Sequence, residues 1–214
     1  YKNPYTFSKW QGEELCKMYE QIYGLNVTIC RFYNVYGDYM PTEGEYRTVI
    51  PIFLEQYKNG ESITVTGDGE QRRDFTHVDD IVDAMMKVVQ LNKWGSVYEL
   101  GRGENHSINE LAEMVYDGHN ITYIEPIPGE VRNTLCKSEL ARKKLKWEPK
   151  INLKDWIGYK MKYENVVSQK QAEERLKYLN TELAHEGYHD GWTLQGMREE
   201  KEWLEKELER LDAE

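Results

Sequence analysis

The sequence predicts an α/β fold for its first 160 residues, because short apolar runs typical of strands alternate with longer amphipathic runs typical of helices. Turn and capping residues separate the two kinds of segment along the chain. From about residue 162 the strand-like runs end, and charged, helix-favouring residues take over. We therefore expect an α/β region, residues 1–160, followed by a helical extension, residues 161–214.

A helix is expected first, over residues 6–23, with Gly24 as its C-terminal cap. Apolar residues recur at helical spacing within it: Leu15, Met18, Tyr19 and Ile22. Residues 27–33 follow as a buried strand, because they are rich in β-branched and aromatic side chains. A polar loop over residues 37–45 then leads to a second helix over residues 48–58.

The next strand is expected at residues 63–66, where the sequence Gly67-Asp68-Gly69 ends it. Asp79 is expected to cap the following helix, because aspartate is a preferred N-cap residue. Three residues of that helix should face the core: Ile81, Met85 and Val88. Another strand is expected at residues 97–100.

Two helix starts are expected after that strand. Ser107 and Glu110 have the spacing of a capping box, in which each side chain bonds the backbone N–H of the other residue. Ser138 is expected to cap a short helix that ends near Lys146.

The extension contains two apolar stripes separated by a turn-rich break at residues 185–192. The first stripe consists of Ala172, Leu176, Leu179 and Leu183. The second consists of Leu194, Met197, Leu204, Leu208 and Leu211, with Lys201 at a core-type position. Because narrow apolar stripes must pack on each other or on a partner, we expect an antiparallel helical hairpin or a dimerising pair.

The composition argues against several function classes. A formal net charge of -10 disfavours a nucleic-acid binder, whose affinity comes from Lys and Arg contacts to phosphates. The longest apolar runs are too short to span a bilayer, and no signal-peptide pattern opens the chain. Cys16, Cys30 and Cys136 lack metal-ligand spacing, so no metal site is expected. Interpreted as reduced core thiols, they favour a cytoplasmic protein.

Tyr5 and Lys9 form the first candidate for chemistry. Residues four apart lie one above the other on a helix, so the hydroxyl and the ammonium can converge on one point. A phenol titrates near pH ~10, and a neighbouring cation favours the phenolate and brings proton transfer within reach of neutral pH. Taken alone, the pair also fits an ordinary exposed helix face.

Further motifs follow the sequence Tyr5-Thr6-Phe7-Ser8-Lys9 in order. Residues 31–37 read Arg-Phe-Tyr-Asn-Val-Tyr-Gly, and residues 67–75 read Gly-Asp-Gly-Glu-Gln-Arg-Arg-Asp-Phe, with Val-Asp-Asp at 78–80. Pro-Gly-Glu-Val-Arg at 128–132 and Leu-Lys-Trp-Glu-Pro at 145–149 complete the series. This succession resembles the extended short-chain dehydrogenase/reductase family, and within it the NAD-dependent nucleotide-sugar epimerases and dehydratases such as UDP-glucose 4-epimerase-like enzymes. The resemblance implies the C-terminal portion of a Rossmann-type fold with its small substrate-binding subdomain.

The resemblance implies catalytic and cofactor-binding roles for three residues. Tyr5 would take a proton from a sugar hydroxyl as hydride passes to NAD, because both must leave together for a ketone to form. Lys9 would lower the pKa of Tyr5 and bind the nicotinamide ribose. Tyr33 would lie beside the nicotinamide, so Tyr5, Lys9 and Tyr33 are the expected cofactor contacts.

It also implies three substrate contacts, toward a nucleotide-diphosphate sugar. Asn34 would bond the sugar-phosphate part, although an asparagine at a strand end is also a common turn former. Arg73 and Arg132 would hold the diphosphate, since a guanidinium donates paired hydrogen bonds to phosphate oxygens. Arg72 is adjacent, but strand alternation directs only one of the two arginines toward the site, and the family pattern selects Arg73.

Other polar residues of this region are expected to be structural. Asp74 is expected to act as a turn partner, and His77 as a packing or surface residue without a catalytic role.

The sequence departs from the family in three ways. No glycine-rich dinucleotide motif follows a strand, so the main NAD-binding motif is absent from these residues and is expected in an N-terminal half outside them; residue 1 is tyrosine, not methionine. Thr66 lies where many relatives carry an aromatic residue against the base, which leaves the base unassigned. Gly37 is followed by Asp38 rather than by the more usual proline.

We therefore expect an NAD-dependent nucleotide-sugar epimerase that acts through a keto-sugar intermediate, present here as its C-terminal, substrate-binding half. The isolated chain should be inactive without a cofactor half, whether that half is continuous with it or separately encoded. A nucleotide-sugar 4,6-dehydratase or decarboxylase of the same family is one alternative, and a catalytically silent nucleotide-sugar-binding or assembly module is another. A homodimer or an assembly through the helical extension is expected, with no nucleic-acid or membrane partner.

Overall fold

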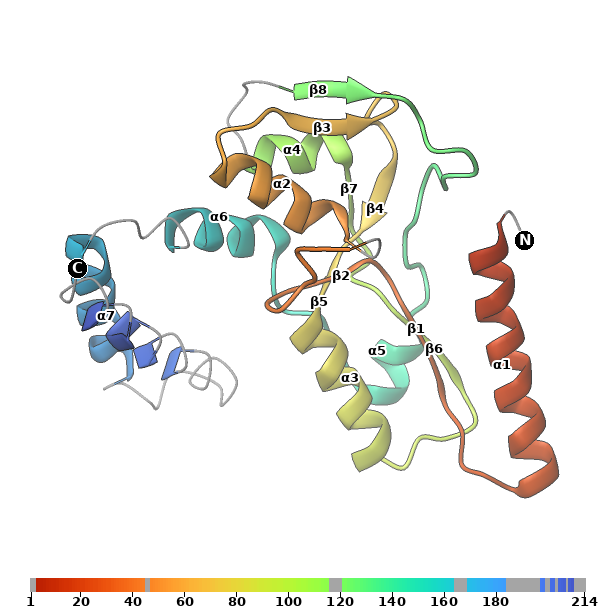
Figure 1. The fold of residues 1–214 in the computed structure, drawn as a ribbon. Coiled ribbons are helices and arrows are strands. Elements are labelled where there is room, and N and C mark those ends of the chain that lie inside the picture. The colour runs from red at the N-terminus through yellow and green to blue at the C-terminus, as the bar shows by residue number, and fades with distance from the viewer. Residues whose placement is uncertain are drawn as a thin grey trace. The chain divides into compact units, whose positions relative to one another are not determined.

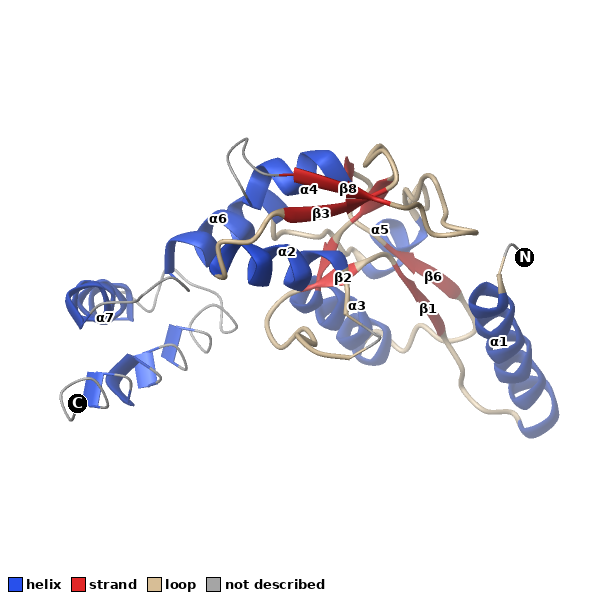
Figure 2. Cartoon of the chain, turned by 45° about the horizontal axis from the view of Figure 1, so that its top comes forward, coloured by secondary structure: helices blue, strands red, loops and turns tan. Residues whose placement is uncertain are grey.

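The chain divides into two units, residues 1–157 and 158–214, which are described separately. The computed structural model describes residues 3–44, 47–115, 121–163, 169–183, 197–198, 201–202, 204–206 and 208–209. Figure 1 gives the order of the elements, and Figure 2 distinguishes helices, strands and loops. Parallel strand pairs and covering helices make the first unit an α/β structure, as the sequence predicts.

The first helix, α1 (Pro4–Tyr23), begins and ends at local signals in the sequence. Asn3 is the N-cap, and its side-chain oxygen accepts a hydrogen bond of 2.9 Å from the Thr6 N–H. Gly24 ends the helix with a φ of 65°, and its N–H donates to the Glu20 carbonyl at 2.9 Å, so the predicted cap is confirmed. The apolar stripe of α1 is exposed rather than buried: Leu15, Met18, Tyr19 and Ile22.

Strands in the first unit pair mostly in parallel. The parallel pairs are β1 (Ile29–Phe32) with β6 (Val97–Leu100), β2 (Val35–Tyr36) with β5 (Thr76–His77), and β3 (Ile63–Thr66) with β8 (Ile121–Ile124). An antiparallel pair joins β4 (Arg72–Asp74) to β7 (Asn105–Ser107). The sequence predicted β1, β3 and β6, although β1 is shorter than the expected buried strand over 27–33 and its last two residues are exposed. Four of the five other strands have only two or three residues and carry too little pattern to be recognised, whereas β8 is as long as β3 and its length does not explain why it was missed.

Helices cover these strand pairs in two groups (Figure 2). Helices α2 (Val49–Lys58) and α4 (Ile108–Val115) pack on each other and on β3. Helices α3 (Val78–Gln90) and α5 (Leu140–Leu145) pack together, and α5 lies against β6. Helix α6 (Leu153–Tyr163) follows, and it buries Leu153 and Ile157 in the first unit.

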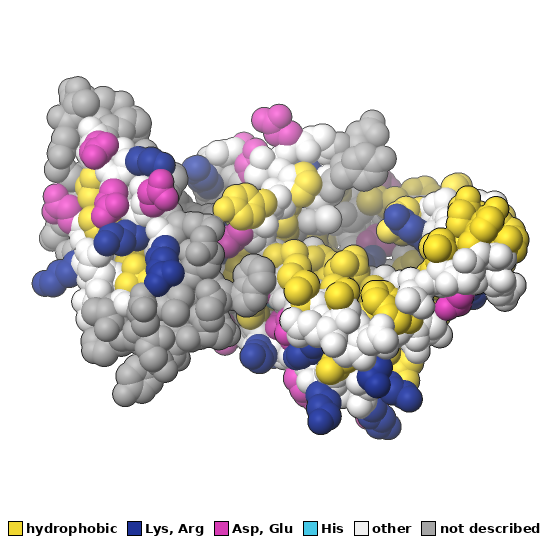
Figure 3. All heavy atoms as spheres, turned by 90° about the horizontal axis from the view of Figure 1, so that it is seen from below, with side chains coloured by type: hydrophobic (Ala, Val, Ile, Leu, Met, Phe, Trp, Pro, Cys, Tyr) yellow, Lys and Arg dark blue, Asp and Glu magenta, His cyan; other side chains and the backbone are white. Residues whose placement is uncertain are grey.

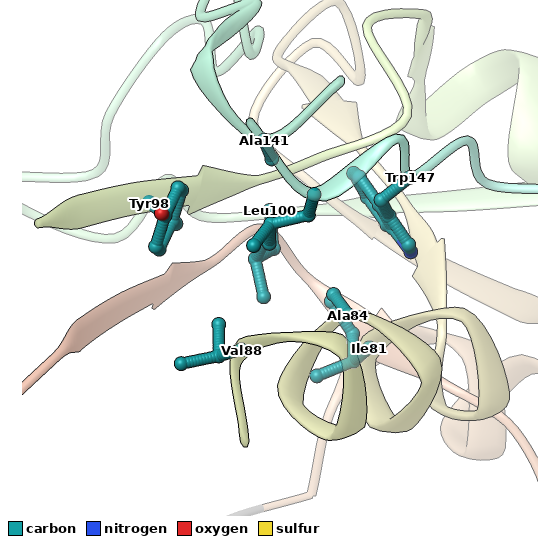
Figure 4. Close-up of a cluster of buried hydrophobic side chains, with 8 residues drawn as sticks. Ile81, Ala84, Val88, Tyr98, Leu100, Ala141 and Trp147 are labelled. Atoms are coloured by element: carbon teal, nitrogen blue, oxygen red, sulfur yellow. The ribbon is translucent and has the colours of Figure 1, made fainter. Parts of the chain in front are cut away.

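The core beside β6 unites residues from distant parts of the chain (Figure 4). Its buried side chains are Ile81, Ala84, Val88, Tyr98, Leu100, Ala141, Leu145 and Trp147. The Trp147 indole also donates to the Asp80 carbonyl at 2.8 Å. The prediction for Met85 is wrong, because Met85 is 45% exposed while Ala84 faces the core beside Ile81 and Val88. Figure 3 shows further exposed hydrophobic side chains on the face that it presents.

Helix capping follows the sequence in one case and departs from it in another. The Ser107 hydroxyl accepts from the Glu110 N–H at 3.0 Å, and the Glu110 carboxylate accepts from the Ser107 N–H at 3.1 Å, which confirms the capping box. The predicted cap at Asp79 is wrong, because the N-cap of α3 is His77, two residues earlier. The buried His77 side chain accepts a hydrogen bond of 3.2 Å from the Asp79 N–H.

A weaker cap begins α5. The Ser138 hydroxyl accepts from the Leu140 N–H at 3.4 Å, while Glu139 occupies the N-cap position. The helix ends at Leu145, before a left-handed Lys146.

The three cysteines do not all lie in the core. Cys136 is buried and Cys30 is half-buried, so burial raises the pKa of both thiols. Cys16 is exposed on α1, which corrects its interpretation as a core thiol. Along the stretches that the structure describes, no helix is both long and apolar enough to cross a bilayer.

The second unit brings the two predicted apolar stripes together. In α7 (Gln169–Leu183), Leu179 is fully buried together with Leu204 of the second stripe. Leu176, Met197 and Leu208 pack against this pair. Because the two stripes pack on each other within one chain, the structure favours the helical hairpin over the dimerising pair. The homodimer stays a prediction. The expected break at 185–192, Leu194 and Leu211 lie outside the described residues.

Candidate active site

A cavity of about 330 Å³ opens where two parallel strands end. The strands are β3 and β8, and the Gly67 N–H donates to the Ile124 carbonyl at 2.9 Å just beyond their last pair. Two segments line the cavity: Thr66, Gly67, Asp68 and Gln71 from the first, and Pro126, Ile127, Glu130, Val131 and Arg132 from the second. Ligands of open α/β sheets bind at the carboxyl ends of parallel strands, so this cavity is the candidate substrate site.

Two tight turns present charged side chains at this cavity. In the turn at residues 67–70, the Asp68 carboxylate accepts a hydrogen bond of 3.0 Å from the Glu70 N–H. In the turn at residues 127–130, the Glu130 N–H donates to the Ile127 carbonyl at 3.2 Å, and Gly129 has a φ of 79°. A Pro-Gly pair at the centre of a turn favours type II geometry, which requires that positive φ.

Arg132 forms a forked ion pair with Asp68. Its two Nη atoms donate to the two carboxylate oxygens at 2.6 and 2.8 Å. The hydrogen bond from Arg132, followed by that from the Glu70 N–H, lowers the pKa of Asp68 to about 2. Both side chains are more than half exposed, so this pair is accessible from solvent.

Arg73 approaches the same cavity from β4. Its Nη2 donates to the Glu130 carboxylate at 2.7 Å, and its Nη1 donates to the Arg72 carbonyl at 3.0 Å. The side chain is largely buried, and that burial lowers the pKa of Arg73. Arg132 thus lines the cavity itself, whereas Arg73 comes from a separate segment and reaches the lining through Glu130.

Arg72 is engaged elsewhere. Its guanidinium donates to the two Glu110 carboxylate oxygens at 2.9 and 3.0 Å and to the Asn105 side chain at 2.9 Å. These partners belong to α4 and β7, so the two neighbouring arginines of β4 bind different groups: Arg72 binds Glu110 and Asn105, and Arg73 binds Glu130. The role predicted for Arg73 as a substrate contact stays a prediction.

The Asn34 side chain lies within a protein network. Its backbone has a positive φ of 23°, and its Nδ2 donates to the Asp74 carbonyl at 2.9 Å and the Thr134 hydroxyl at 3.2 Å. The turn-forming role left open by the sequence is thus present. Its predicted contact with the substrate stays a prediction.

Asp74 is a structural centre that the sequence did not fully reveal. The residue is completely buried, and its carboxylate accepts from the backbone N–H groups of Arg102 and Gly103 at 2.9 Å and of Cys136 at 3.0 Å. These bonds tie the segment carrying Arg73 to two others. The sequence indicated only a turn partner, because the donors lie far along the chain.

Tyr33 is half-buried just beyond β1. Its N–H donates to the Leu100 carbonyl at 3.2 Å. Burial, followed by the Glu99 carboxylate, raises the pKa of Tyr33 to about 12. Tyr33 therefore stays a neutral phenol near neutral pH, which fits a contact residue better than a base.

Tyr5 and Lys9 lie together near the start of α1. The Lys9 ammonium is 5.4 Å from the centroid of the Tyr5 ring, and Tyr5 is 67% exposed. Helix α1 is tied to β1 by Arg31, which donates to both Glu13 carboxylate oxygens at 2.7 Å. Within the described stretches, no hydrogen bond or ion pair joins the Tyr5 or Lys9 side chain to the cavity residues.

We expect Gly69→Ala to disrupt the turn that carries Asp68. Gly69 has a φ of 72°, and a Cβ there would lie 1.9 Å from Asn109 Oδ1. Asn109 itself holds the turn through the Gly69 and Asp68 carbonyls, at 3.0 Å each. The combined strain and lost hydrogen bonds should lower the free energy of unfolding by about 2–3 kcal/mol.

The matched control for that change is Gly60→Ala. Gly60 has a similar φ of 68° but no atom within 4 Å of the added Cβ, so this variant measures backbone strain alone, about 1 kcal/mol. Thermal unfolding followed by circular dichroism compares the two. Equal losses would show that Asn109 does not restrain the turn.

Comparison with known proteins gives a consistent family. Residues 1–101 match the model of the NAD dependent epimerase/dehydratase family. A putative UDP-glucose 4-epimerase of Methanocaldococcus jannaschii is 36% identical over 160 residues, which cover 72% of this chain and 51% of the relative. Other matches are named as a decarboxylase and a 4,6-dehydratase of nucleotide sugars.

Two solved structures show the same likeness. The UDP-glucose 4-epimerase of Thermotoga maritima, solved with UDP-glucose, has a TM-score of 0.68 and 32% identity, and the match covers 75% of this chain and 53% of that one. The UDP-glucuronic acid 4-epimerase of Bacillus cereus, in complex with UDP-glucuronic acid and NAD, has a TM-score of 0.66 and 26% identity, with coverage of 73% and 50%. The chain spans about half the length of these relatives.

Sequence motifs, fold and similarity thus agree over the first unit, and the chain belongs to the NAD-dependent epimerase/dehydratase family, within the extended short-chain dehydrogenases/reductases.

Proposed function

We propose that this chain supplies the substrate-binding and acid/base part of an NAD-dependent nucleotide-sugar epimerase. The observation that carries the proposal is that Arg132 lines the cavity beyond β3 and β8, while Arg73 is bonded to Glu130, another residue of the same lining. Paired guanidinium donors suit the oxygens of a diphosphate, and the cavity provides room beside them. Their delivery by two separate segments supports a site for a phosphorylated ligand despite the acidic total charge.

In the proposed reaction, Arg73 and Arg132 hold the diphosphate while Tyr5 exchanges a proton with the reacting sugar hydroxyl. Lys9, whose ammonium lies over the Tyr5 ring, stabilises the phenolate electrostatically. Its remaining N–H donors suit a ribose hydroxyl, so the pair fits the nicotinamide end of NAD. NAD, when bound, supplies the acceptor and later the donor of hydride. Tyr33 would cover the nicotinamide as a neutral phenol.

We propose further that a dinucleotide-binding segment outside these 214 residues completes the site. The glycine-rich motif that holds a pyrophosphate is not found in this sequence. The N–H groups of Ile29 and Tyr33 face β6, so alternation directs those of Cys30 and Phe32 to the opposite edge of β1. No described strand pairs with that edge, and Phe32 is 49% exposed. Parallel sheets are normally covered on both faces, so the exposed Phe32 side chain and the unpaired edge of β1 both support a further segment there.

Ligand titration of the 214-residue chain tests the substrate part of this proposal. UDP should bind measurably by isothermal titration calorimetry, and Arg132→Ala should weaken that binding about 10-fold or more, since a charge-assisted pair is lost. Glu139→Gln is the control, because it breaks an exposed pair of 2.7 Å with Lys143 that does not line the cavity. NAD should not bind in the micromolar range.

The outcomes separate the alternatives. UDP binding that Arg132→Ala leaves unchanged would contradict the diphosphate site. Micromolar NAD binding by the chain alone would contradict the need for a further cofactor segment. UDP binding without epimerisation, even when a cofactor segment is supplied, would favour a silent binding module.

A further inference from the structure

The Arg132 guanidinium, which lines the cavity, is already bound to an anion of the protein itself, the Asp68 carboxylate. Both Nη atoms donate to Asp68, in the forked geometry that a phosphate would also use. The Glu70 N–H holds the Asp68 carboxylate at 3.0 Å, and the Asn109 amide holds the Asp68 carbonyl at 3.0 Å. A ligand that binds both Nη atoms of Arg132 must therefore replace a carboxylate that the turn itself holds in place.

Arg132 is the movable member of the pair. Its side chain is 62% exposed, and a long side chain in solvent has several low-energy conformers. Arg73, in contrast, is largely buried and donates to both Glu130 and the Arg72 carbonyl. Exchange of partners on ligand binding is therefore easier at Arg132 than at Arg73.

We propose that Asp68 is an internal counter-ion that competes with the substrate diphosphate for Arg132 and so sets the affinity of the site. This inference rests on the proposed function and adds a positioning residue to it. In the ligand-free protein Asp68 holds the guanidinium at the cavity; on binding, the diphosphate replaces the carboxylate at the Nη atoms. The carboxylate that is left beside the bound dianion then opposes binding by like-charge repulsion.

Asp68→Asn is the variant that isolates this competition. Asparagine retains a side-chain oxygen that can accept from the Glu70 N–H, so the turn is preserved, while the negative charge and one acceptor toward Arg132 are lost. An exposed ion pair is weak, so affinity for UDP should rise by about two- to fivefold. Inorganic pyrophosphate should gain similarly, because the competition concerns the diphosphate and not the base.

A double-mutant cycle on the 214-residue chain shows whether Asp68 acts through Arg132. Calorimetric Kd values for UDP and pyrophosphate are measured for the wild type, Asp68→Asn, Arg132→Ala and the double variant. Tighter binding of Asp68→Asn that disappears in the Arg132→Ala background would support the proposal. Melting temperatures check that the turn remains folded, and Glu139→Gln controls for the loss of one surface charge.

The contrary results are distinct. If Asp68→Asn binds UDP as weakly as the wild type or more weakly, while Arg132→Ala still reduces the affinity for UDP, the counter-ion role is overturned and the diphosphate site is not. A gain that persists in the Arg132→Ala background would also overturn it, because general charge repulsion would then explain the effect. Failure of the wild type to bind UDP and pyrophosphate would contradict the proposed function, and the counter-ion role with it.

Discussion

Replacing Asp74 with asparagine is expected to destabilise the first unit by about 3–5 kcal/mol. The carboxylate of this fully buried residue accepts three backbone N–H groups, from Arg102, Gly103 and Cys136. The amide nitrogen of an asparagine cannot accept a hydrogen bond, so some of these backbone N–H groups would lose their acceptor. The negative charge that strengthens each bond would also be lost. Because Arg73 precedes Asp74, the loosened segment should also displace the predicted diphosphate contact.

Thermal and urea unfolding measure this effect, with an expected fall in melting temperature on the order of 10 °C for a unit of this size. Asp83→Asn is the matched control, because Asp83 forms only a partly exposed pair with Lys87 at 2.7 Å. Its loss should change the free energy of unfolding by less than about 0.5 kcal/mol. Similar stability of the two variants would show that Asp74 is not the centre on which the three segments depend.

Removal of the Tyr5 hydroxyl should have the largest effect on catalysis. In an active enzyme that contains this chain, Tyr5→Phe is expected to lower kcat by about 10²–10⁴-fold, because phenylalanine cannot exchange a proton with the sugar hydroxyl. Affinity for UDP should remain within about twofold, since the predicted diphosphate contacts, Arg73 and Arg132, lie on other segments. Turnover of a nucleotide-diphosphate sugar provides the activity measurement, with UDP-glucose as the first probe because the Thermotoga maritima relative was solved with it, and calorimetry with UDP provides the affinity.

Tyr19→Phe is the control on the same helix. Tyr19 is also exposed, and its ring packs 5.2 Å from that of Tyr23, so the variant removes a hydroxyl without affecting Tyr5 or Lys9. Its turnover should match the wild type. Near-normal turnover by Tyr5→Phe would remove Tyr5 from the mechanism and would leave the exposed pair on α1 without a catalytic role.

The sequence predicted best those elements whose signals are local. The strands at 63–66 and 97–100 have the predicted bounds, the Gly24 cap ends α1, and Ser107 and Glu110 form their capping box. Each depends on interactions within a few residues, so composition and spacing are sufficient. Four of the five strands that were missed have only two or three residues, and their distant partners define them.

Local reasoning failed where tertiary packing chose between similar residues. Met85 and Ala84 both continue the helical spacing from Ile81, but packing around β6 buries the smaller side chain. Asp79 is a good N-cap by type, yet the preceding strand places the start of α3 two residues earlier than that cap predicts. Both differences arise because neighbouring elements fix where a helix begins and which side faces the core.

The sequence by itself determined the family and the α/β class, because these follow from ordered motifs and periodicity, and it predicted the residues of the site. Only the tertiary structure decided that Arg73 reaches Glu130 while Arg72 reaches Glu110, and that Asp68 holds Arg132. The physical reason is that such pairs join residues far apart in the chain. Their geometry depends on how strands and turns are packed, which no local pattern encodes.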